Sequence, residues 1–508
     1  MEQYFKKYNI FFLVVILALA VFFRLYQLKT IPPGLYPDEA MNGNNALETI
    51  HNNDYKVFYS ENNGREGLFI DIQAVSVKIF GNEPWSLRII SAIFGVFTVL
   101  GLYLLAKELF NKESIALLSS FFLAVSFWHI NFSRIGFRAI MAPFFLVWGL
   151  WLVWKLLGSG ASKWKLRFLA VAAGLIFGLG FHSYISYRIA PVLLIIPFWL
   201  LIKNKKILPI ILFIIGFLVA IYPLISYFYE HPQDFLGRTT QISIFSAPSP
   251  ILELGKNILL TVGMFFVYGD GNWRHNIAGA PELWWPVAIL FLIGFIISIK
   301  NFRVPRYALL VTWFIVLLLP VIISDEGIPH ALRSIIVVPV AMIFASIGFC
   351  WLAEKINRPK LIFLIFIFLL AVSINTYKQY FLDWAGNPNV ALAFNKNYTL
   401  LGNYLKYSPS DIKKYVIINT ESEKIDFMPM PVQPVMFLTD TYSLQQQKKK
   451  NIFYVLPKDF GDFIIKARRE NNFQIFMLKN DPLLRRQLLD NISGLFTYEN
   501  EGILIQQK

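Results

Sequence analysis

The sequence predicts a polytopic α-helical membrane protein with a small α/β domain at its C-terminal end. Of the 508 residues, 56% are hydrophobic and 16% are charged, whereas typical soluble domains have about 25% charged residues. Long apolar segments recur up to about residue 377, and shorter runs of strand length follow. These two observations exclude a soluble enzyme and divide the chain into a membrane domain (1–377) and a C-terminal domain (378–508).

The membrane domain is predicted from apolar segments that can cross a bilayer. A spanning helix needs about 20 mainly apolar residues. About eleven segments qualify, the sixth being short: 9–28, 86–106, 113–130, 139–157, 168–186, 189–202, 207–228, 283–299, 307–324, 334–353 and 360–377.

Two further features bear on the topology. The first apolar segment is longer than the core of a signal peptide, and no small-residue cleavage site follows Arg24, so we expect it to remain as the first helix. The stretch 251–268 is apolar, but Glu253 and Lys256 lie near its start and glycines interrupt it. We interpret it as an interfacial or re-entrant helix.

The charges of the connections predict the orientation. The N-terminal segment and the connections after spans two, four, six, eight and ten hold 17 basic and four acidic residues. The first connection on the other side, residues 29–85, holds four basic and eight acidic residues. Basic residues concentrate on the cytoplasmic side. We therefore expect a protein of the cytoplasmic membrane with a cytoplasmic N-terminus and an extracytoplasmic C-terminal domain. The net charge of +15 then indicates topology, and no nucleic-acid partner.

The C-terminal domain shows β-like runs starting at Tyr415, Val435, Ile452 and Phe473, separated by polar helical stretches such as 459–471. This alternation predicts a small α/β domain. The run of three glutamines and three lysines before Asn451 is interpreted as a solvated loop.

Cysteine and histidine usage predicts no metal site. Cys350 is the single cysteine, which excludes an intrachain disulfide and a cysteine-based metal site. The six histidines lie in or near the outer segments, and no two have the spacing of zinc ligands.

The long first outer loop, 29–85, offers the first candidate chemistry. Its proline-rich entry leads to Asp38 and Glu39 at the start of a helical pattern. Acidic residues after a proline are typical of helix capping. The alternative is that one carboxylate faces a cavity at the membrane surface and acts as a general base.

Three other outer segments, 128–138, 182–188 and 269–275, combine arginine with tyrosine, tryptophan and histidine. They are either an interfacial belt of aromatic residues and arginine or a phosphate clamp beside a sugar-stacking surface. Because the inner connections use mainly lysine and few aromatics, we favour the clamp.

At these residues the sequence resembles the GT-C glycosyltransferases, in particular the family 39 and 83 group of protein O-mannosyltransferases and lipid A aminoarabinose transferases. The resemblance covers most of residues 1–350. It is based on PPGLYPDEA in the first outer loop, NNGREGLFI at 62–70, SRIGFRA at 133–139, HSYISYRIAP at 182–191 and GDGNWRHN at 269–276.

The resemblance implies a GT-C fold and transfer of a sugar from a polyprenyl-phosphate carrier, with inversion, on the outer face of the membrane. It implies no required cofactor, and as partners membrane lipids, the lipid-linked sugar and a cell-envelope acceptor, which is a lipid, a glycan or a protein. Asp38 matches the loop-one aspartate proposed to deprotonate or orient the acceptor hydroxyl, and Glu39 is its neighbour.

Other candidates follow from the same resemblance. The sequence differs from the relatives after the Arg65–Glu66 pair, where Gly67 stands in place of the proline common in them. The candidate donor-phosphate ligands are Arg65, Glu66, Arg138, Arg188 and Arg274. The candidate substrate contacts are Tyr36, His182, Tyr184, Tyr187, Trp273 and His275.

Two other classes of function remain as alternatives. A polyprenyl-lipid flippase or transporter is less favoured because the chain has no internal repeat and few ionisable mid-span residues. A non-catalytic scaffold whose C-terminal domain binds wall polymer would tolerate replacement of Asp38.

Overall fold

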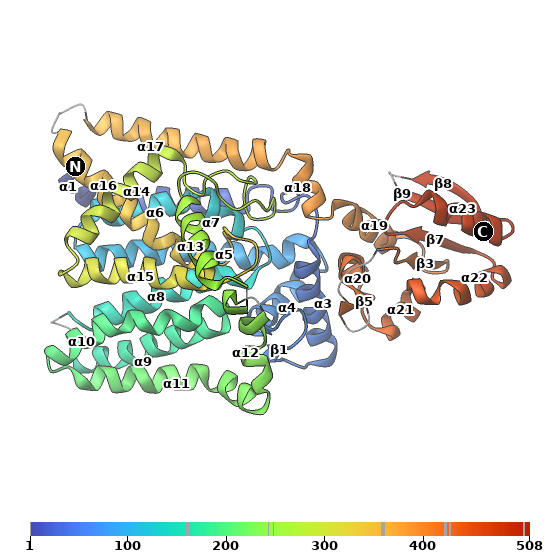
Figure 1. The fold of residues 1–508 in the computed structure, drawn as a ribbon, viewed down its shortest axis with the longest axis horizontal. Helices are drawn as coiled ribbons and strands as arrows, with labels where there is room; N and C mark the ends of the chain where they lie inside the picture. The colour runs from blue at the N-terminus through green and yellow to red at the C-terminus, as the bar shows by residue number, and fades with distance from the viewer. Residues whose placement is uncertain are drawn as a thin grey trace. The chain divides into compact units, whose positions relative to one another are not determined.

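The computed structural model describes residues 2–158, 162–241, 243–246, 248–356, 361–420, 424–425, 428–500 and 503–508. The chain forms two compact units, drawn in Figure 1. The membrane unit comprises Met1–Ile31, Lys56–Phe69 and Arg88–Asn387. The C-terminal unit comprises Pro32–Tyr55, Ile70–Leu87 and Pro388–Lys508. The division at residue 377 expected from composition stays a prediction.

The membrane unit is almost entirely helical. Its elements are α1 (Glu2–Lys7), α2 (Asn9–Leu25), β1 (Phe58–Tyr59), β2 (Arg65–Glu66), most of α5 (Pro84–Phe110), α6 (Glu113–Ala124), α7 (Phe127–Phe132), η1 (Arg138–Ile140), α8 (Met141–Lys155), α9 (Lys163–Leu179), η2 (Gly180–His182), η3 (Ile185–Leu194), α10 (Ile195–Lys203), α11 (Ile207–Glu230), α12 (Pro232–Gln241), η4 (Ile244–Ser246), α13 (Pro250–Gly263), α14 (Trp285–Lys300), α15 (Pro305–Ile322), η5 (Ile335–Val337), α16 (Val338–Ile356), α17 (Leu361–Tyr377) and the π-helix η6 (Lys378–Trp384).

Eight helical segments among the described residues are long and apolar enough to cross a membrane. They are Pro84–Phe110, Arg138–Lys155, Lys163–His182, Ile185–Lys203, Ile207–Glu230, Pro305–Ile322, Ile335–Lys355 and Phe363–Trp384. Shorter apolar helices, α2, α6 and α14, occupy the remaining three predicted ranges. Residue 360, where the last predicted span begins, lies outside the described residues. The predicted polytopic helical fold class is confirmed.

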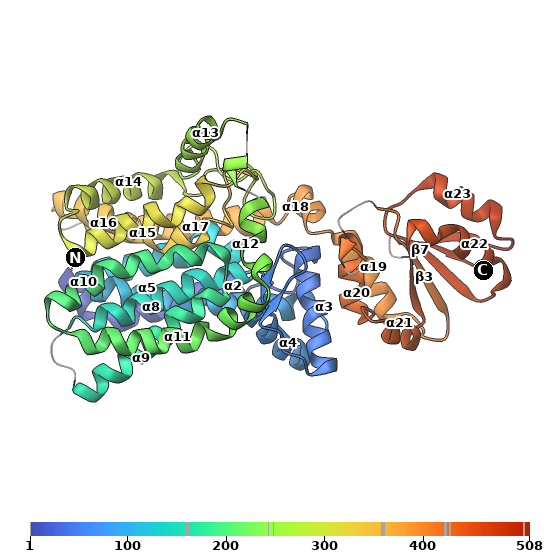
Figure 2. The same ribbon diagram turned by 60° about the horizontal axis from the view of Figure 1, so that its bottom comes forward.

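Glycines let neighbouring helices approach closely. Helices α9 and α11 run side by side (Figures 1 and 2), and a Cβ on Gly174 would lie 2.0 Å from the carbonyl oxygen of Phe213. A Cβ on Gly348 of α16 would lie 2.0 Å from the carbonyl oxygen of Leu290 of α14. Small residues at such crossings increase van der Waals contact, which drives helix association in lipid.

The lysine-rich connections gather at one end of the helix bundle. The backbone N–H of Ser114 donates to Glu2 (3.0 Å), and Lys112 lies 3.4 Å from Glu354. Lys206 donates to the carbonyl oxygen of Leu157 (2.9 Å). The N-terminus marks this end in Figure 1, and β1 and α12 lie at the opposite end. The connections predicted to share one side of the membrane therefore do lie together, while their orientation stays a prediction.

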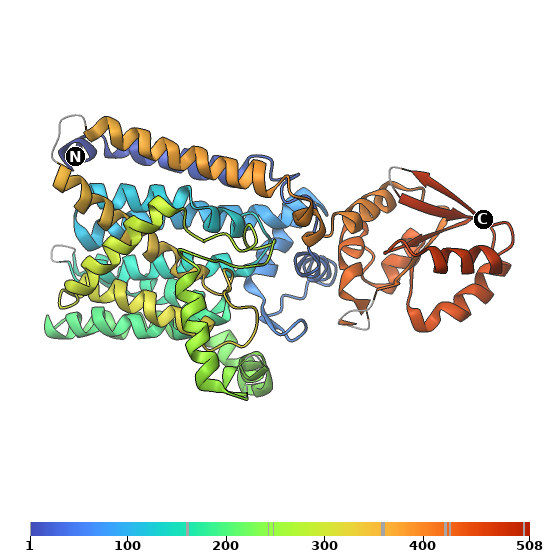
Figure 3. The same ribbon diagram turned by 45° about the horizontal axis from the view of Figure 1, so that its top comes forward.

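Helix α13 (Pro250–Gly263) covers most of the stretch 251–268, which is predicted to be interfacial or re-entrant. It has 14 residues, fewer than a span needs, and it runs across the direction of the other helices (Figures 2 and 3). Ile251 and Leu259 are 87% and 75% exposed.

The C-terminal unit contains a five-stranded mixed sheet of order β6-β3-β7-β9-β8. Strand β3 pairs in parallel with β6 and β7, and β9 pairs antiparallel with β7 and β8. The unit's elements are α3 (Pro37–Asn52), most of α4 (Leu68–Phe80), α18 (Pro388–Ala393), α19 (Lys396–Tyr407), β3 (Lys413–Ile417), β4 (Lys424–Ile425), β5 (Met428–Pro429), η7 (Met430–Val432), α20 (Gln433–Thr439), α21 (Leu444–Lys450), β6 (Ile452–Val455), η8 (Pro457–Asp459), α22 (Phe460–Arg469), β7 (Phe473–Met477), α23 (Pro482–Asn491), β8 (Phe496–Asn500) and β9 (Ile503–Gln507).

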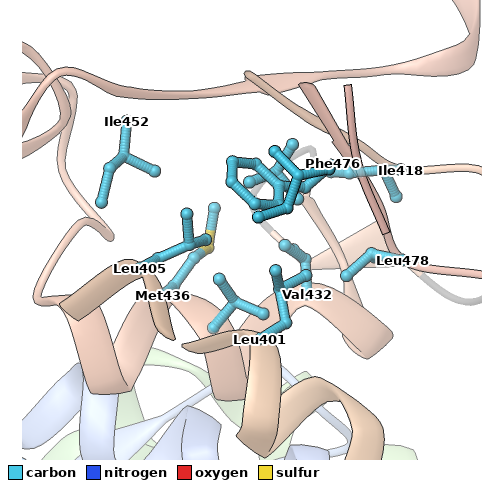
Figure 4. Packing of buried hydrophobic residues seen from close by; sticks show 11 residues of the cluster. Leu401, Leu405, Ile418, Val432, Met436, Ile452, Phe476 and Leu478 are labelled. Carbon is cyan, nitrogen blue, oxygen red and sulfur yellow. The ribbon is translucent and has the colours of Figure 1, made fainter. Parts of the chain in front are cut away.

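Helices cover both faces of this sheet because side chains alternate along each strand. Val416 packs with Leu405 of α19 and Met436 of α20, in the core drawn in Figure 4. Its neighbour Tyr415 packs on the other face with Phe463 of α22. The predicted α/β organisation of this region is confirmed.

The first-loop helix α3 packs against α20 in the same unit. Asn44 donates to the side-chain oxygen of Gln433 (2.7 Å), and the ring of Phe437 lies against Gly43. The backbone N–H of Leu35 donates to Thr399 Oγ1 (2.8 Å). These contacts join the loop segment 32–55 to the C-terminal region of the chain.

Two predictions within the C-terminal region are wrong. The run from Val435, predicted as a strand, lies in helix α20, because Met436 packs toward the sheet while Phe437 packs toward Leu35 and Leu47. The sequence of a short helix that is buried on both sides has the same continuous apolar pattern as a buried strand. The run predicted as a solvated loop is helix α21, whose N-terminus is capped by Ser443.

Candidate functional site

A short hairpin brings part of the first loop to the polar end of the membrane unit, which we define as the segments 56–69, 127–138, 180–188, 264–284 and 324–335. Strands β1 and β2 pair antiparallel, with Tyr59 opposite Arg65. Gly64, in the turn, has φ = +81°, which favours glycine. A Cβ on Gly67 would lie 1.7 Å from the carbonyl oxygen of Lys56, so the backbone also requires glycine here.

The carboxylate of Glu66 lies between two arginines from different helices. Arg138 Nε donates to Glu66 Oε2 (2.8 Å), and Arg188 Nη2 lies 3.9 Å from Oε1. Arg138 also donates to the carbonyl oxygen of Gly64 (3.0 Å) and lies over the ring of Tyr184, 5.6 Å from its centroid. The Glu66 side chain is 3% exposed, whereas those of Arg138 and Arg188 are 20% and 22% exposed. The structure thus assembles a cationic pair on a buried carboxylate beside an aromatic ring.

Arg65 has different partners because adjacent strand residues face opposite sides. Its Nη2 lies 3.5 Å from Glu61 Oε2, and its guanidinium lies 5.4 Å from the ring centroid of Tyr59. Arg65 is therefore held within the hairpin.

Arg274, Trp273 and His275 belong to a second polar cluster, in the segment between α13 and α14. His275 Nδ1 lies 2.8 Å from Asp270 Oδ2, and Arg274 Nε donates to Asn272 (3.2 Å). The carbonyl oxygen of Trp273 accepts from Trp384 Nε1 (2.8 Å).

His330 completes this cluster from the segment after α15. Its Nδ1 lies 3.9 Å from Asp270 Oδ2, and the backbone N–H of Ala331 donates to the same oxygen (2.8 Å). Asp270, His275 and His330 each offer one potential metal-ligand atom, and these three atoms lie within 4.8 Å of one another.

Burial dominates the electrostatics of this cluster. Burial lowers the pKa of His275, although the hydrogen bond to Asp270 opposes the shift. Burial and the neighbouring charge of His275 hold the pKa of His330 well below its usual value. Burial alone would raise the pKa of Asp270, but the interactions with both histidines lower it. Burial also raises the pKa of Glu282, which accepts from the backbone N–H of Asp270 (3.1 Å). At neutral pH both imidazoles are therefore uncharged.

A small groove with a cavity volume of about 40 Å³ lies beside this cluster. Residues of the segment 276–284, among them Asn276 and Glu282, line part of it, and α6, α14, α16 and α17 contribute apolar side chains such as Phe122, Val287 and Val372.

Three other predicted residues are placed in the helix bundle. His182 Nε2 lies 2.9 Å from the carbonyl oxygen of Ala220, and Tyr187 is fully buried against Phe177. Tyr184, in contrast, lies at the Arg138 side chain.

Asp38, Glu39 and Tyr36 belong to the C-terminal unit. Helix α3 begins at Pro37, and Glu39 Oε2 accepts from the backbone N–H of Tyr36 (3.3 Å) in a capping box. The capping interpretation thus describes Glu39, while the role of Asp38 stays a prediction.

Comparison with known proteins adds to this geometry. Residues 69–227 match the family described as dolichyl-phosphate-mannose-protein mannosyltransferase. A curated protein of Bacillus subtilis (strain 168) named "Putative mannosyltransferase YkcB" is 29% identical over 219 residues. The match covers 41% of this chain and spans 28% of that relative's length.

Solved structures of membrane proteins match nearly the whole chain. ArnT from Cupriavidus metallidurans, bound to undecaprenyl phosphate, aligns over 98% of both chains with 12% identity and a TM-score of 0.55. The oligosaccharyltransferase AglB from Archaeoglobus fulgidus, in complex with an inhibitory peptide and a dolichol-phosphate, aligns over 98% of this chain and 74% of its own, with 15% identity and a TM-score of 0.54. The family match, the curated relative and the shared fold all make this chain similar to glycosyltransferases of the GT-C superfamily.

The GT-C resemblance predicted from the sequence is confirmed. The family match at 69–227 contains Arg138, Tyr184 and Arg188. Asp38 and the cluster around Asp270 lie outside it.

Sequence reasoning did not single out Asp270, Glu282 or His330. Asp270 lies five residues before His275 in a predicted segment, so proximity offered a signal for it. His330 is joined to the cluster only by folding, since Ala331 and Asp270 are 61 residues apart.

Proposed function

We propose that this protein is a glycosyltransferase of the cytoplasmic membrane that transfers a sugar from a polyprenyl-phosphate carrier to a cell-envelope acceptor on the outer face. The observation that carries this proposal is the Glu66, Arg138 and Arg188 group at the polar end. Two guanidiniums, partly exposed and held on one buried carboxylate, present a preorganised cationic site for a phosphate. The undecaprenyl phosphate bound to ArnT and the dolichol-phosphate bound to AglB support a polyprenyl-type donor.

The groove beside Glu282 supports the same donor. A polyprenyl tail needs apolar contacts within the membrane, and apolar side chains of α6, α14, α16 and α17, among them Phe122, Val287 and Val372, offer such contacts at the groove. Tyr184, at Arg138, offers an aromatic surface of the kind on which sugars stack.

The proposed reaction is an inverting displacement. Asp38 removes the proton of the acceptor hydroxyl, whose oxygen forms a bond to the anomeric carbon from the face opposite the phosphate. The bond between that carbon and the phosphate oxygen breaks, and both electrons leave with the polyprenyl phosphate. Arg138 and Arg188 stabilise the negative charge on the leaving phosphate. A phosphate leaving group needs little help from a general acid, so the reaction requires only one essential carboxylate, and the proposal includes no required cofactor.

In the proposed topology, the N-terminus is cytoplasmic and the C-terminal domain is extracytoplasmic.

Other residues have supporting roles in this proposal. Glu39 supports Asp38 through the start of helix α3. Further donor and substrate contacts are assigned to Tyr36, Arg65, His182, Tyr187, Trp273, Arg274 and His275.

The test uses the purified full chain in nanodiscs with a panel of undecaprenyl-phosphate-linked hexoses and pentoses, measuring release of undecaprenyl phosphate. We expect Asp38→Asn to reduce turnover by about 10²–10⁴-fold, the usual contribution of a general base, without loss of folded protein. Glu48→Gln, which neutralises another carboxylate of helix α3, serves as the matched control. Full turnover in Asp38→Asn would remove the catalytic assignment.

A second assay separates the enzyme from a flippase. Proteoliposomes containing the labelled carrier lipid report its movement between leaflets. Movement of intact lipid that is insensitive to Asp38→Asn, without sugar release, would replace the proposed transferase by a transporter.

A further inference from the structure

The cluster of Asp270, His275 and His330 has the composition of a metal site, a function that the sugar-transfer proposal does not assign to it. Two imidazoles and one carboxylate converge from two segments of the polar end, and their ligand atoms lie within 4.8 Å of one another. Nitrogen and oxygen ligands of this kind suit divalent transition metals such as Zn²⁺.

The distances leave room for a cation between the ligands. Zn²⁺ binds histidine nitrogen and carboxylate oxygen at about 2.0–2.2 Å, so two of its ligand atoms lie up to about 4 Å apart. His330 Nδ1 and Asp270 Oδ2 are 3.9 Å apart, too far for a hydrogen bond. His275 Nδ1 lies 2.8 Å from the same oxygen. Shifts of about 1 Å or less bring all three atoms onto one ion.

The hydrogen bond that His330 Nδ1 accepts is weak. The backbone N–H of Arg333 donates to this nitrogen over a long 3.4 Å. Binding of a cation at Nδ1 would therefore replace only a weak contact, and Asp270 Oδ2 lies 3.9 Å from the same nitrogen.

The surroundings hold the ligands in place. Asp270 Oδ1 accepts from the backbone N–H of Asn272 (2.8 Å), and Asn131 donates to the carbonyl oxygen of His275 (2.9 Å). Side chains of His275 and Asp270 are each 5% exposed, and that of His330 is 15% exposed. Outer contacts that orient the ligands are characteristic of metal sites.

The nearby arginine is committed elsewhere. Arg333 donates to the carbonyl oxygen and to the carboxylate of Glu326 (2.8 Å each) and contacts Ser324. The guanidinium therefore does not occupy the space between the three ligands.

We propose that Asp270, His275 and His330 bind a divalent transition metal that ties the segment between α13 and α14 to the segment after α15. Three protein ligands leave one or more coordination positions to water or an anion. The metal's role is to hold the two segments of the polar end together.

Metal binding is measured on the full chain in detergent, purified without a polyhistidine tag. After EDTA treatment the protein is dialysed against Zn²⁺, and retained zinc is measured by mass spectrometry. We expect one zinc per chain in the wild type. In His330→Gln and Asp270→Asn we expect the affinity for zinc to be at least about tenfold lower than in the wild type. The matched control is His51→Gln, because His51 Nε2 also lies 3.1 Å from a carboxylate, that of Asp440, but without a third ligand among the described residues. It should retain the full zinc content.

Thermal unfolding separates binding from misfolding. In EDTA, the wild type and His330→Gln should unfold at the same temperature, and Zn²⁺ should raise the unfolding temperature of the wild type and of His51→Gln only. Absence of retained zinc in the wild type, or equal retention in His330→Gln and Asp270→Asn, would overturn the proposal. Neither readout depends on sugar transfer, so the outcome is independent of that activity.

Discussion

Arg138 and Glu66 are 72 residues apart in the chain, yet Arg138 Nε lies 2.8 Å from Glu66 Oε2. This ion pair joins the hairpin of the first loop to the segment that begins α8. The carboxylate is almost fully buried and also faces Arg188. The pair therefore has a structural role in addition to the proposed phosphate contact, and the two roles can be separated by mutation.

Arg138→Met should destabilise the protein by about 3 kcal/mol, because it leaves the buried Glu66 carboxylate without its hydrogen-bonding partner. The double variant Arg138→Met with Glu66→Gln should recover most of this loss, since the buried charge is also removed. Thermal unfolding in detergent measures both effects. A double variant no more stable than the single one would contradict the pairing. Under the proposed function, neither variant should recover donor affinity.

Glu39 is expected to act through the helix cap. Glu39→Ala removes the acceptor of the Tyr36 N–H and should cost about 0.5–1 kcal/mol, in the range measured for helix caps. Glu39→Gln keeps an acceptor at this position and should retain both stability and most of the turnover. Unfolding temperatures and the undecaprenyl-phosphate release assay are the measurements. A loss of turnover in Glu39→Gln as large as that in Asp38→Asn would instead make Glu39 part of the catalytic machinery.

Asp71 should make stability fall with rising pH. Burial, together with the charge of Asp54, raises the pKa of Asp71 from 3.8 to about 6. The folded state thus holds this proton more tightly than the unfolded state, so stability is lost as pH rises from about 4 to 6 and the penalty is constant above 6. Because Asp71 is only half-buried, we expect the free energy of unfolding to fall by about 1 kcal/mol over this pH range.

Asp71→Asn should therefore be more stable than the wild type at pH 7 and nearly equal to it near pH 4. Unfolding temperatures across this range test the expectation, and Asp54→Asn should show a smaller effect of the same sign. A stability gain for Asp71→Asn that is the same at both pH values would exclude titration of Asp71 as its cause.

The crossing of α14 and α16 should tolerate no larger side chain at Gly348. A Cβ there would lie 2.0 Å from the carbonyl oxygen of Leu290, so Gly348→Val must push the helices apart. We expect this to lower the free energy of unfolding by at least about 1–3 kcal/mol. Gly255→Ala is the control, because a Cβ at that position in helix α13 meets nothing within 4 Å and alanine favours a helix by about 0.5–1 kcal/mol. The two variants should shift the unfolding temperature in opposite directions.

The membrane helices could be predicted because their signal is local: about 20 apolar residues in a row identify a span regardless of its neighbours. Helix α20 could not be predicted in this way. Its neighbouring residues Met436 and Phe437 are both buried, each in a different hydrophobic core on a different side of the helix. A four-residue apolar run carries no period that would distinguish helix from strand.

The same contrast holds at the polar end. Glu66, Arg138 and Arg188 were predicted from their residue types and the resemblance of their motifs, and the fold brings them together. Asp270 and His330 could not be paired from the sequence, because neither lies in a spacing typical of metal ligands. They come close together only because helix packing brings the segment between α13 and α14 next to the segment after α15.

The contact between Asn44 and Gln433 has a consequence for biosynthesis. The two residues are 389 positions apart, so helix α3 leaves the ribosome long before the helix against which it packs. At about 5–20 residues per second, this interval is roughly 20–80 s. During that time the segment carrying Asp38 lacks its final packing partner. A chain that terminates before α20 would therefore synthesise every predicted membrane span and still never complete the folding of its first loop.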